Sequence, residues 1–212
     1  MRLLALAVAA AYTAFGLTFR GPREGFWDRM TLTGLALGTL ALATDRDAKR
    51  VRIGAREAAL GLASAAGLYA LFRAGDAFAR RVMPRGGAEI GDIYALRSLR
   101  PRGELAARLA LVIGPAEELF WRGLVQGRAG FLATTALYGG AHLVTANMTL
   151  VGAATVAGAY WGLLRAIGAP LGALVVSHVA WDIWIFLVAP TTSSKGALPS
   201  SEPPGWTWVK SA

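Results

Sequence analysis

The stretch GPAEELFWRG, residues 114–123, contains two adjacent carboxylates, Glu117 and Glu118, and one arginine, Arg122. It lies within an otherwise apolar run from 109 to 125. A charge near the centre of a bilayer costs about 2.5 to 3.5 kcal/mol on insertion scales. Three charges close together are therefore expected either to pair with other groups or to have a function. Whether that cost applies depends on whether the run lies in a membrane.

The composition of the whole chain favours a membrane. Of 212 residues, 55% are hydrophobic and only 17% are charged, and the mean hydropathy is +0.45. These values are too apolar for a water-soluble domain of this size, so we predict an integral membrane protein. The absence of cysteine excludes disulfides, thiolate metal sites and a cysteine nucleophile.

Seven apolar runs are candidates for membrane spans. Several are shorter than the ~20 residues of a full crossing, so the second and third could be tilted or re-entrant, and the count could be six or eight. The first run could instead be a signal peptide, because a short basic end precedes an apolar core and small residues. We predict an all-α polytopic transmembrane bundle of about seven helices, forming a single domain over residues 1–189. The runs are 3–19, 30–44, 58–72, 109–126, 129–145, 149–164 and 170–189.

The basic residues lie between the apolar runs. The net charge of +9 is not arranged as a stripe interleaved with exposed aromatic residues, so it suits anionic lipid headgroups and not nucleic acid. Residues 74–104 hold six arginines and are expected to form an interfacial segment on the cytoplasmic face, with the protein multi-pass in the plasma membrane. The tail 190–212 is rich in Pro, Ser, Thr and Gly and is predicted to be disordered.

Charged and histidine side chains recur at a spacing of four residues in the later runs. Glu118 and Arg122 form one such pair, and helical spacing puts both on one face, where they can form an ion pair that is mainly structural. Glu117 then remains about 100° around the helix without a partner in its own segment. Burial without a partner makes a carboxylate a stronger base, so Glu117 is a candidate general base, the alternative being a second partner for Arg122. Pro115 is expected to kink this helix.

Both histidines of the chain take part in this spacing. Tyr138 precedes His142, and His178 precedes Asp182, by four residues each. A carboxylate one turn away can accept the ring N–H of His178 and fix its tautomer. The alternative for each histidine is a structural hydrogen bond that joins helices.

These residues resemble the CPBP family of intramembrane proteases, which is related to the CAAX prenyl endopeptidase and is also called the Abi family. Its motifs are Glu-Glu-x-x-x-Arg, Phe-x-x-x-His and His-x-x-x-Asn or Asp, and the resemblance covers about 104–189, the motif-bearing core. One position departs from the pattern, because tyrosine replaces the phenylalanine of the second motif. The matching residues are Glu117, Glu118 and Arg122, then Tyr138 and His142, then His178 and Asp182.

The resemblance implies an endopeptidase that hydrolyses a peptide or protein substrate, which could be lipidated, from the cytoplasmic side. Glu117 and His142 would hold and deprotonate the water, and His178 would stabilise the oxyanion. Ionised Asp182 cannot donate a hydrogen bond, so we expect it to orient His178. The family is often labelled metalloprotease, and Glu117, His142 and His178 could bind zinc with one position open for water. The same groups suffice without a metal, and we slightly prefer the metal-free route.

Three other functions remain open from the sequence. A non-catalytic immunity or scaffold protein of the same family would retain the motifs without cleaving a substrate. A haem protein could use His142 and His178 as axial ligands, which a visible spectrum would reveal. An ion or proton transporter could use the carboxylates as a relay, with pH-dependent flux in liposomes as its signature.

Overall fold

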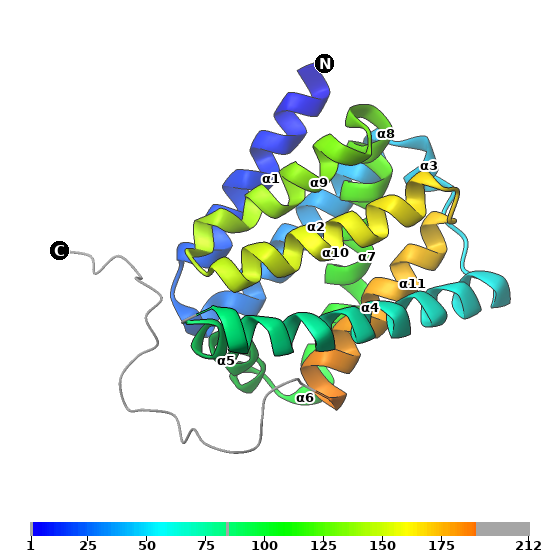
Figure 1. Ribbon diagram of the computed structural model, residues 1–212. Coiled ribbons are helices and arrows are strands. Elements are labelled where there is room, and N and C mark those ends of the chain that lie inside the picture. The colour runs from blue at the N-terminus through cyan, green and yellow to red at the C-terminus, as the bar shows by residue number, and fades with distance from the viewer. Residues whose placement is uncertain (1, 84, 190–212) are drawn as a thin grey trace.

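The computed structural model describes residues 2–83 and 85–189, and within these ranges every regular element is helical (Figure 1). The predicted all-α fold is confirmed, whereas the predicted disordered tail 190–212 lies outside the described residues. The α-helices are α1 Arg2–Arg20, α2 Phe26–Thr44, α3 Arg46–Lys49, α4 Ala55–Val82, α5 Gly86–Ala95, α6 Arg102–Arg108, α7 Gly114–Glu118, α8 Gln126–Ala129, α9 Phe131–Ala141, α10 Met148–Ala166 and α11 Leu171–Ile183. Short 3-10 turns span Arg23–Gly25, Leu96–Leu99 and His142–Thr145, and π-helical turns span Leu109–Ile113, Leu119–Val125 and Trp184–Val188.

Each of the seven apolar runs coincides with a helical stretch. In Figure 1, α9 and α10 lie side by side, and α4 runs along the lower side of the bundle and packs against α11. Among the described residues, three helical stretches are long and apolar enough to cross a membrane by length and composition: Arg2–Arg20, Ala55–Val82 and Leu171–Val188. These apolar helices suit an integral membrane protein, and the predicted number of about seven crossings stays a prediction.

The helix that carries the two glutamates is interrupted by π turns and not broken. It runs from Arg102 to Ala129 as α6, α7 and α8 joined by the π turns Leu109–Ile113 and Leu119–Val125. Pro115 follows the first π turn, where the N–H of Gly114 bonds to the carbonyl of Leu109. The chain therefore stays helical through a proline that lacks an N–H. Such π turns often occur at functional sites, and here they flank Glu117 and Glu118 on both sides.

The segment 74–104 is divided between several elements. Its first part continues α4 to Val82, α5 follows, and α6 begins at Arg102 directly after Pro101. Arg100 pairs with Asp28 of α2 at 2.6 Å, so this basic segment is tied to the bundle through an ion pair at its end.

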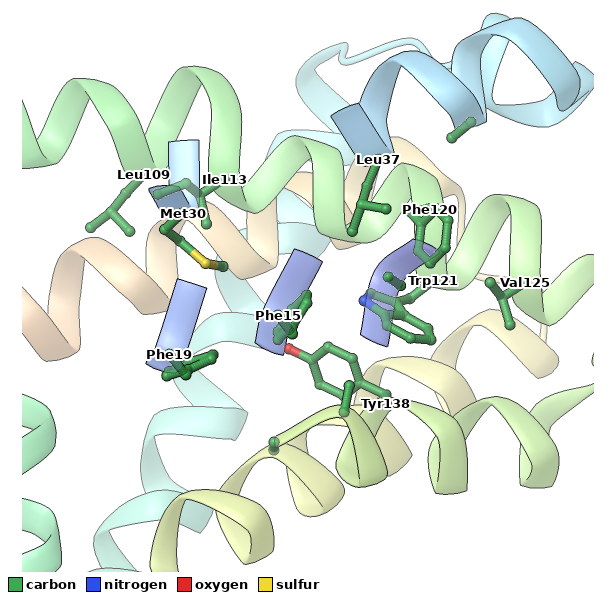
Figure 2. Close-up of a cluster of buried hydrophobic side chains, with 14 of the residues drawn as sticks. Phe15, Phe19, Met30, Leu37, Leu109, Ile113, Phe120, Trp121, Val125 and Tyr138 are labelled. Atoms are coloured by element: carbon green, nitrogen blue, oxygen red, sulfur yellow. The ribbon is translucent and has the colours of Figure 1, made fainter. Parts of the chain in front are cut away.

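Small residues bring the motif-bearing helices together. A Cβ atom on Gly114 would lie 2.9 Å from Cγ2 of Val179, so α7 and α11 approach closely only because this position is glycine. A buried cluster fills the space between α1, α2, the 109–125 stretch and α9. In Figure 2, Tyr138 of α9 lies near Trp121, and the two ring centroids are 5.4 Å apart.

Candidate active site

All seven residues that the sequence singled out are buried, with exposed fractions of 7% or less. Five of them line one cavity of about 660 Å³, while Glu118 and Arg122 lie behind its wall. The structure therefore brings the three motifs to one place. The cavity-lining members are Glu117, Tyr138, His142, His178 and Asp182.

The first half of the site joins α7 to α9. The hydroxyl of Tyr138 donates to Oε2 of Glu117 at 2.8 Å, so the tyrosine that replaces phenylalanine has a specific polar partner. Among the described residues, Oε1 of Glu117 has no hydrogen-bond partner. One oxygen of the carboxylate is thus held while the other remains available at the cavity.

His142 is positioned by the end of a helix. It lies in the 3-10 turn that follows α9, where its backbone N–H bonds to Gly139 and Gly140. The carbonyl of Tyr138 is therefore available to the imidazole, and Nδ1 of His142 lies 2.9 Å from it. A carbonyl oxygen can only accept, so Nδ1 carries the proton and Nε2 has a lone pair.

The turn after His142 is held by its own contacts. Ala146 adopts a left-handed conformation with φ of 53°, and Asn147 caps α10 by accepting the N–H of Leu150 at 2.7 Å. On the other side, the ring of Phe15 meets the imidazole edge-on with centroids 5.2 Å apart. The imidazole of His142 is therefore held by contacts with two helices.

The second half of the site joins α7 to α11. Nδ1 of His178 donates to Oε1 of Glu118 at 2.7 Å, and the same oxygen lies 3.1 Å from Nη1 of Arg122. The predicted ion pair of Glu118 with Arg122 is present by distance, although the guanidinium nitrogens make no well-aligned hydrogen bond. Arg122 also lies over aromatic rings, with its guanidinium carbon 4.6 Å from the Tyr138 ring centroid.

Asp182 makes a weaker contact with His178 than the spacing suggested. Its Oδ2 lies 3.6 Å from Nε2 of His178, which is an ion-pair distance and too long for a hydrogen bond. The hydrogen bond that fixes the imidazole is the one that Nδ1 of His178 donates to Glu118. The sequence argument missed this contact because it compared residues within one helix, and these two residues are 60 positions apart.

A further residue was also missed. Trp161 of α10 stacks on the imidazole of His178, with ring centroids 4.2 Å apart and an interplanar angle of 19°. A tryptophan in an apolar helix is ordinarily a packing residue, and nothing in the local sequence distinguishes this one.

The zinc ligand set that the sequence allowed does not fit this arrangement. Within 2–83 and 85–189, no three His, Asp or Glu side chains are grouped so that they could hold one metal ion. Carboxylates face both ring nitrogens of His178, from Glu118 on one side and Asp182 on the other.

The comparison with known families agrees with the motifs. Residues 104–184 match the family model described as Type II CAAX prenyl endopeptidase Rce1-like, whereas no curated protein and no solved structure matches the chain significantly. The matched residues are less than half of the chain but include all three motifs. Over residues 104–184 the chain therefore carries the pattern of the CAAX prenyl endopeptidase family, which confirms the resemblance inferred from its motifs and supports a CAAX-type intramembrane protease in general.

Proposed function

We propose that this protein is an intramembrane endopeptidase in which Glu117 and His142 activate water and His178 stabilises the oxyanion. One observation carries the proposal: acceptor atoms from two motifs and a histidine from the third line a single cavity. Peptide hydrolysis needs a base for the water, stabilisation of the developing negative charge and a proton for the leaving amine. The chain provides a candidate for each requirement.

Water activation is assigned to Oε1 of Glu117 and Nε2 of His142. The hydrogen bond from Tyr138 to Oε2 holds the carboxylate, and the bond from His142 Nδ1 to the Tyr138 carbonyl holds the imidazole. Both holding contacts involve the same residue, so Tyr138 sets the position of the base relative to the histidine. A water between the two free acceptors would donate one hydrogen bond to each.

In the proposed reaction, Glu117 takes a proton from this water and the water oxygen forms a bond to the substrate carbonyl carbon. The carbonyl electron pair moves to its oxygen, which becomes the oxyanion. When the tetrahedral intermediate collapses, the C–N bond breaks and Glu117 returns the proton to the leaving amine. The carboxylate is thereby regenerated without a further reactant.

Stabilisation of the oxyanion is assigned to His178. Its Nδ1 proton is directed to Glu118, so Nε2 can donate only when the ring is an imidazolium. The carboxylate of Glu118, which accepts from Nδ1, provides the negative charge that compensates this cation. Arg122 in turn balances Glu118 from behind the cavity wall.

The substrate is proposed to be an apolar or lipidated peptide that enters from the cytoplasmic side. Beyond the polar residues, the cavity is lined by apolar side chains of α2, α4, α5, α10 and α11, which suit apolar substrate groups. Metal-free water activation is part of the proposal, because Glu117 and His142 supply the two acceptors that a water needs.

The test is mass-spectrometric detection of cleavage by purified protein reconstituted in liposomes. Prenylated and unprenylated peptide pools are compared for the wild type, Glu117→Ala and, as a matched control, Glu24→Ala at an exposed position. We expect products with the wild type and the control and none with Glu117→Ala, and the pool that is cleaved shows whether the lipid is needed. Identical product profiles for the wild type and Glu117→Ala would overturn the proposal.

A further inference from the structure

Trp161 of α10 is linked to α11 and, through it, to α4 by hydrogen bonds. It is fully buried on α10, and its indole N–H donates to Oγ of Ser177 on α11 at 3.0 Å. Ser177 in turn donates to Oγ of Ser64 on α4 at 3.0 Å. These two hydrogen bonds, together with the packing around the indole, therefore fix the orientation of its ring.

The orientation of the indole in turn restricts the orientation of the His178 imidazole that stacks on it. Glu118 holds His178 at one atom, Nδ1, and a ring held at one atom can still pivot about that contact. The indole is nearly parallel to the imidazole, with ring centroids 4.2 Å apart. It prevents this pivoting motion, because any tilt of the imidazole would make it collide with the indole or would separate the two rings. The two contacts together set where Nε2 of His178 points. An aromatic face also favours a cation stacked upon it, which suits an imidazolium.

We propose that Trp161 is a positioning residue for His178: the chain Ser64–Ser177–Trp161 fixes the plane of the imidazole, so that Nε2 meets the oxyanion. This inference rests on the proposed function and assigns Trp161 a role beyond packing. Misplacement of a reacting group by about 1 Å can reduce a rate 100-fold without any change in chemistry. The stack is thus predicted to affect kcat more than substrate binding.

The kinetic test compares Trp161→Leu with Trp161→Phe. Leucine removes the stacking partner, whereas phenylalanine keeps an aromatic face. We expect Trp161→Leu to lower kcat by about 100-fold with KM nearly unchanged, and Trp161→Phe to restore most of the rate. Trp184→Leu is the matched control, because Trp184 is 48% exposed. A folded Trp161→Leu variant with wild-type kcat would overturn the inference.

The second test does not depend on activity. The chain contains only two histidines, so labelling with isotopic histidine gives two ring spin systems, which His142→Gln assigns. The indole ring current should shift the His178 ring protons upfield in the wild type, and Trp161→Leu should remove that shift while Trp184→Leu leaves it. If the His178 resonances are the same in the wild type and Trp161→Leu, the stack does not hold the ring and the inference fails.

A further variant, Ser177→Ala, tests the inference even if Trp161→Leu does not fold. Ser177→Ala deletes the acceptor of the indole N–H with little change in volume, and we expect a loss of kcat in the same direction and a smaller shift of the His178 resonances. Unchanged kcat and unchanged resonances in this variant would contradict the proposed chain. If the wild type cleaves no peptide, the proposed function is overturned, and the His178 resonances alone decide whether Trp161 holds the ring.

Discussion

Glu118 offers the sharpest test of the arrangement, because one oxygen atom serves two partners. Its side chain is fully buried, its Oε1 accepts from His178 at 2.7 Å and the same atom lies 3.1 Å from Arg122. Glu118→Ala would leave the guanidinium of Arg122 buried without an anion. Breaking a buried ion pair by removing one partner costs about 3 to 5 kcal/mol of unfolding free energy.

That cost translates into a measurable change in melting temperature. For a chain of about 200 residues, 1 kcal/mol corresponds to about 2 to 4 °C, so Glu118→Ala should lower the melting temperature by about 6 to 20 °C. The assay is thermal unfolding of purified protein in detergent, followed by circular dichroism. A melting temperature within about 2 °C of the wild type would refute the reasoning, because it would mean that the buried guanidinium does not depend on Glu118.

A double variant separates stability from function. In Glu118→Leu with Arg122→Met both charges are replaced by apolar groups, which is often neutral or stabilising for a buried pair. We expect this double variant to recover most of the melting temperature that Glu118→Ala loses. It should still fail to cleave peptide, because His178 has lost the acceptor for Nδ1. Recovery of both stability and cleavage would contradict the role assigned to Glu118.

Three further predictions follow from the site. Asp182→Asn should keep substantial activity, since Asp182 contacts His178 only at 3.6 Å; complete loss in a folded variant would show that its negative charge is required. Gly158→Ala should destabilise the protein by about 1 to 3 kcal/mol through overpacking, because the new Cβ would lie 2.8 Å from Cδ1 of Tyr138. Its melting temperature is compared with that of Gly152→Ala, where a Cβ meets nothing within 4 Å. Treatment with EDTA should leave the cleavage rate unchanged; a loss that added Zn²⁺ reverses would contradict the metal-free mechanism.

Much of the architecture was accessible from the sequence. The apolar runs predicted helices at the right places, because long apolar segments in a membrane must satisfy their backbone groups internally. The seven candidate site residues could also be named from the sequence, since charged and histidine residues are rare and costly in apolar helices, and the structure buries all seven. The π turn before Pro115 was not predicted, because it has no clear signature in the sequence.

Within one helix, the geometry of 3.6 residues per turn determined the contacts. The ion-pair distance between Glu118 and Arg122 and the contact of His142 with the Tyr138 carbonyl both follow from a spacing of four. These contacts could be named without knowledge of how the helices pack, because a local spacing is the same in any bundle.

Contacts between helices were decided by the tertiary structure alone. The hydrogen bonds from His178 to Glu118 and from Tyr138 to Glu117, like the stack of Trp161 on His178, join different helices. They depend on the rotation and register of each helix against its neighbours, which are set by close approaches such as that of Gly114 to Val179. Such approaches depend on the packing of whole side-chain surfaces, so the sequence by itself determined which residues are candidates for the chemistry, and only the packed bundle determined which of them hold one another in place.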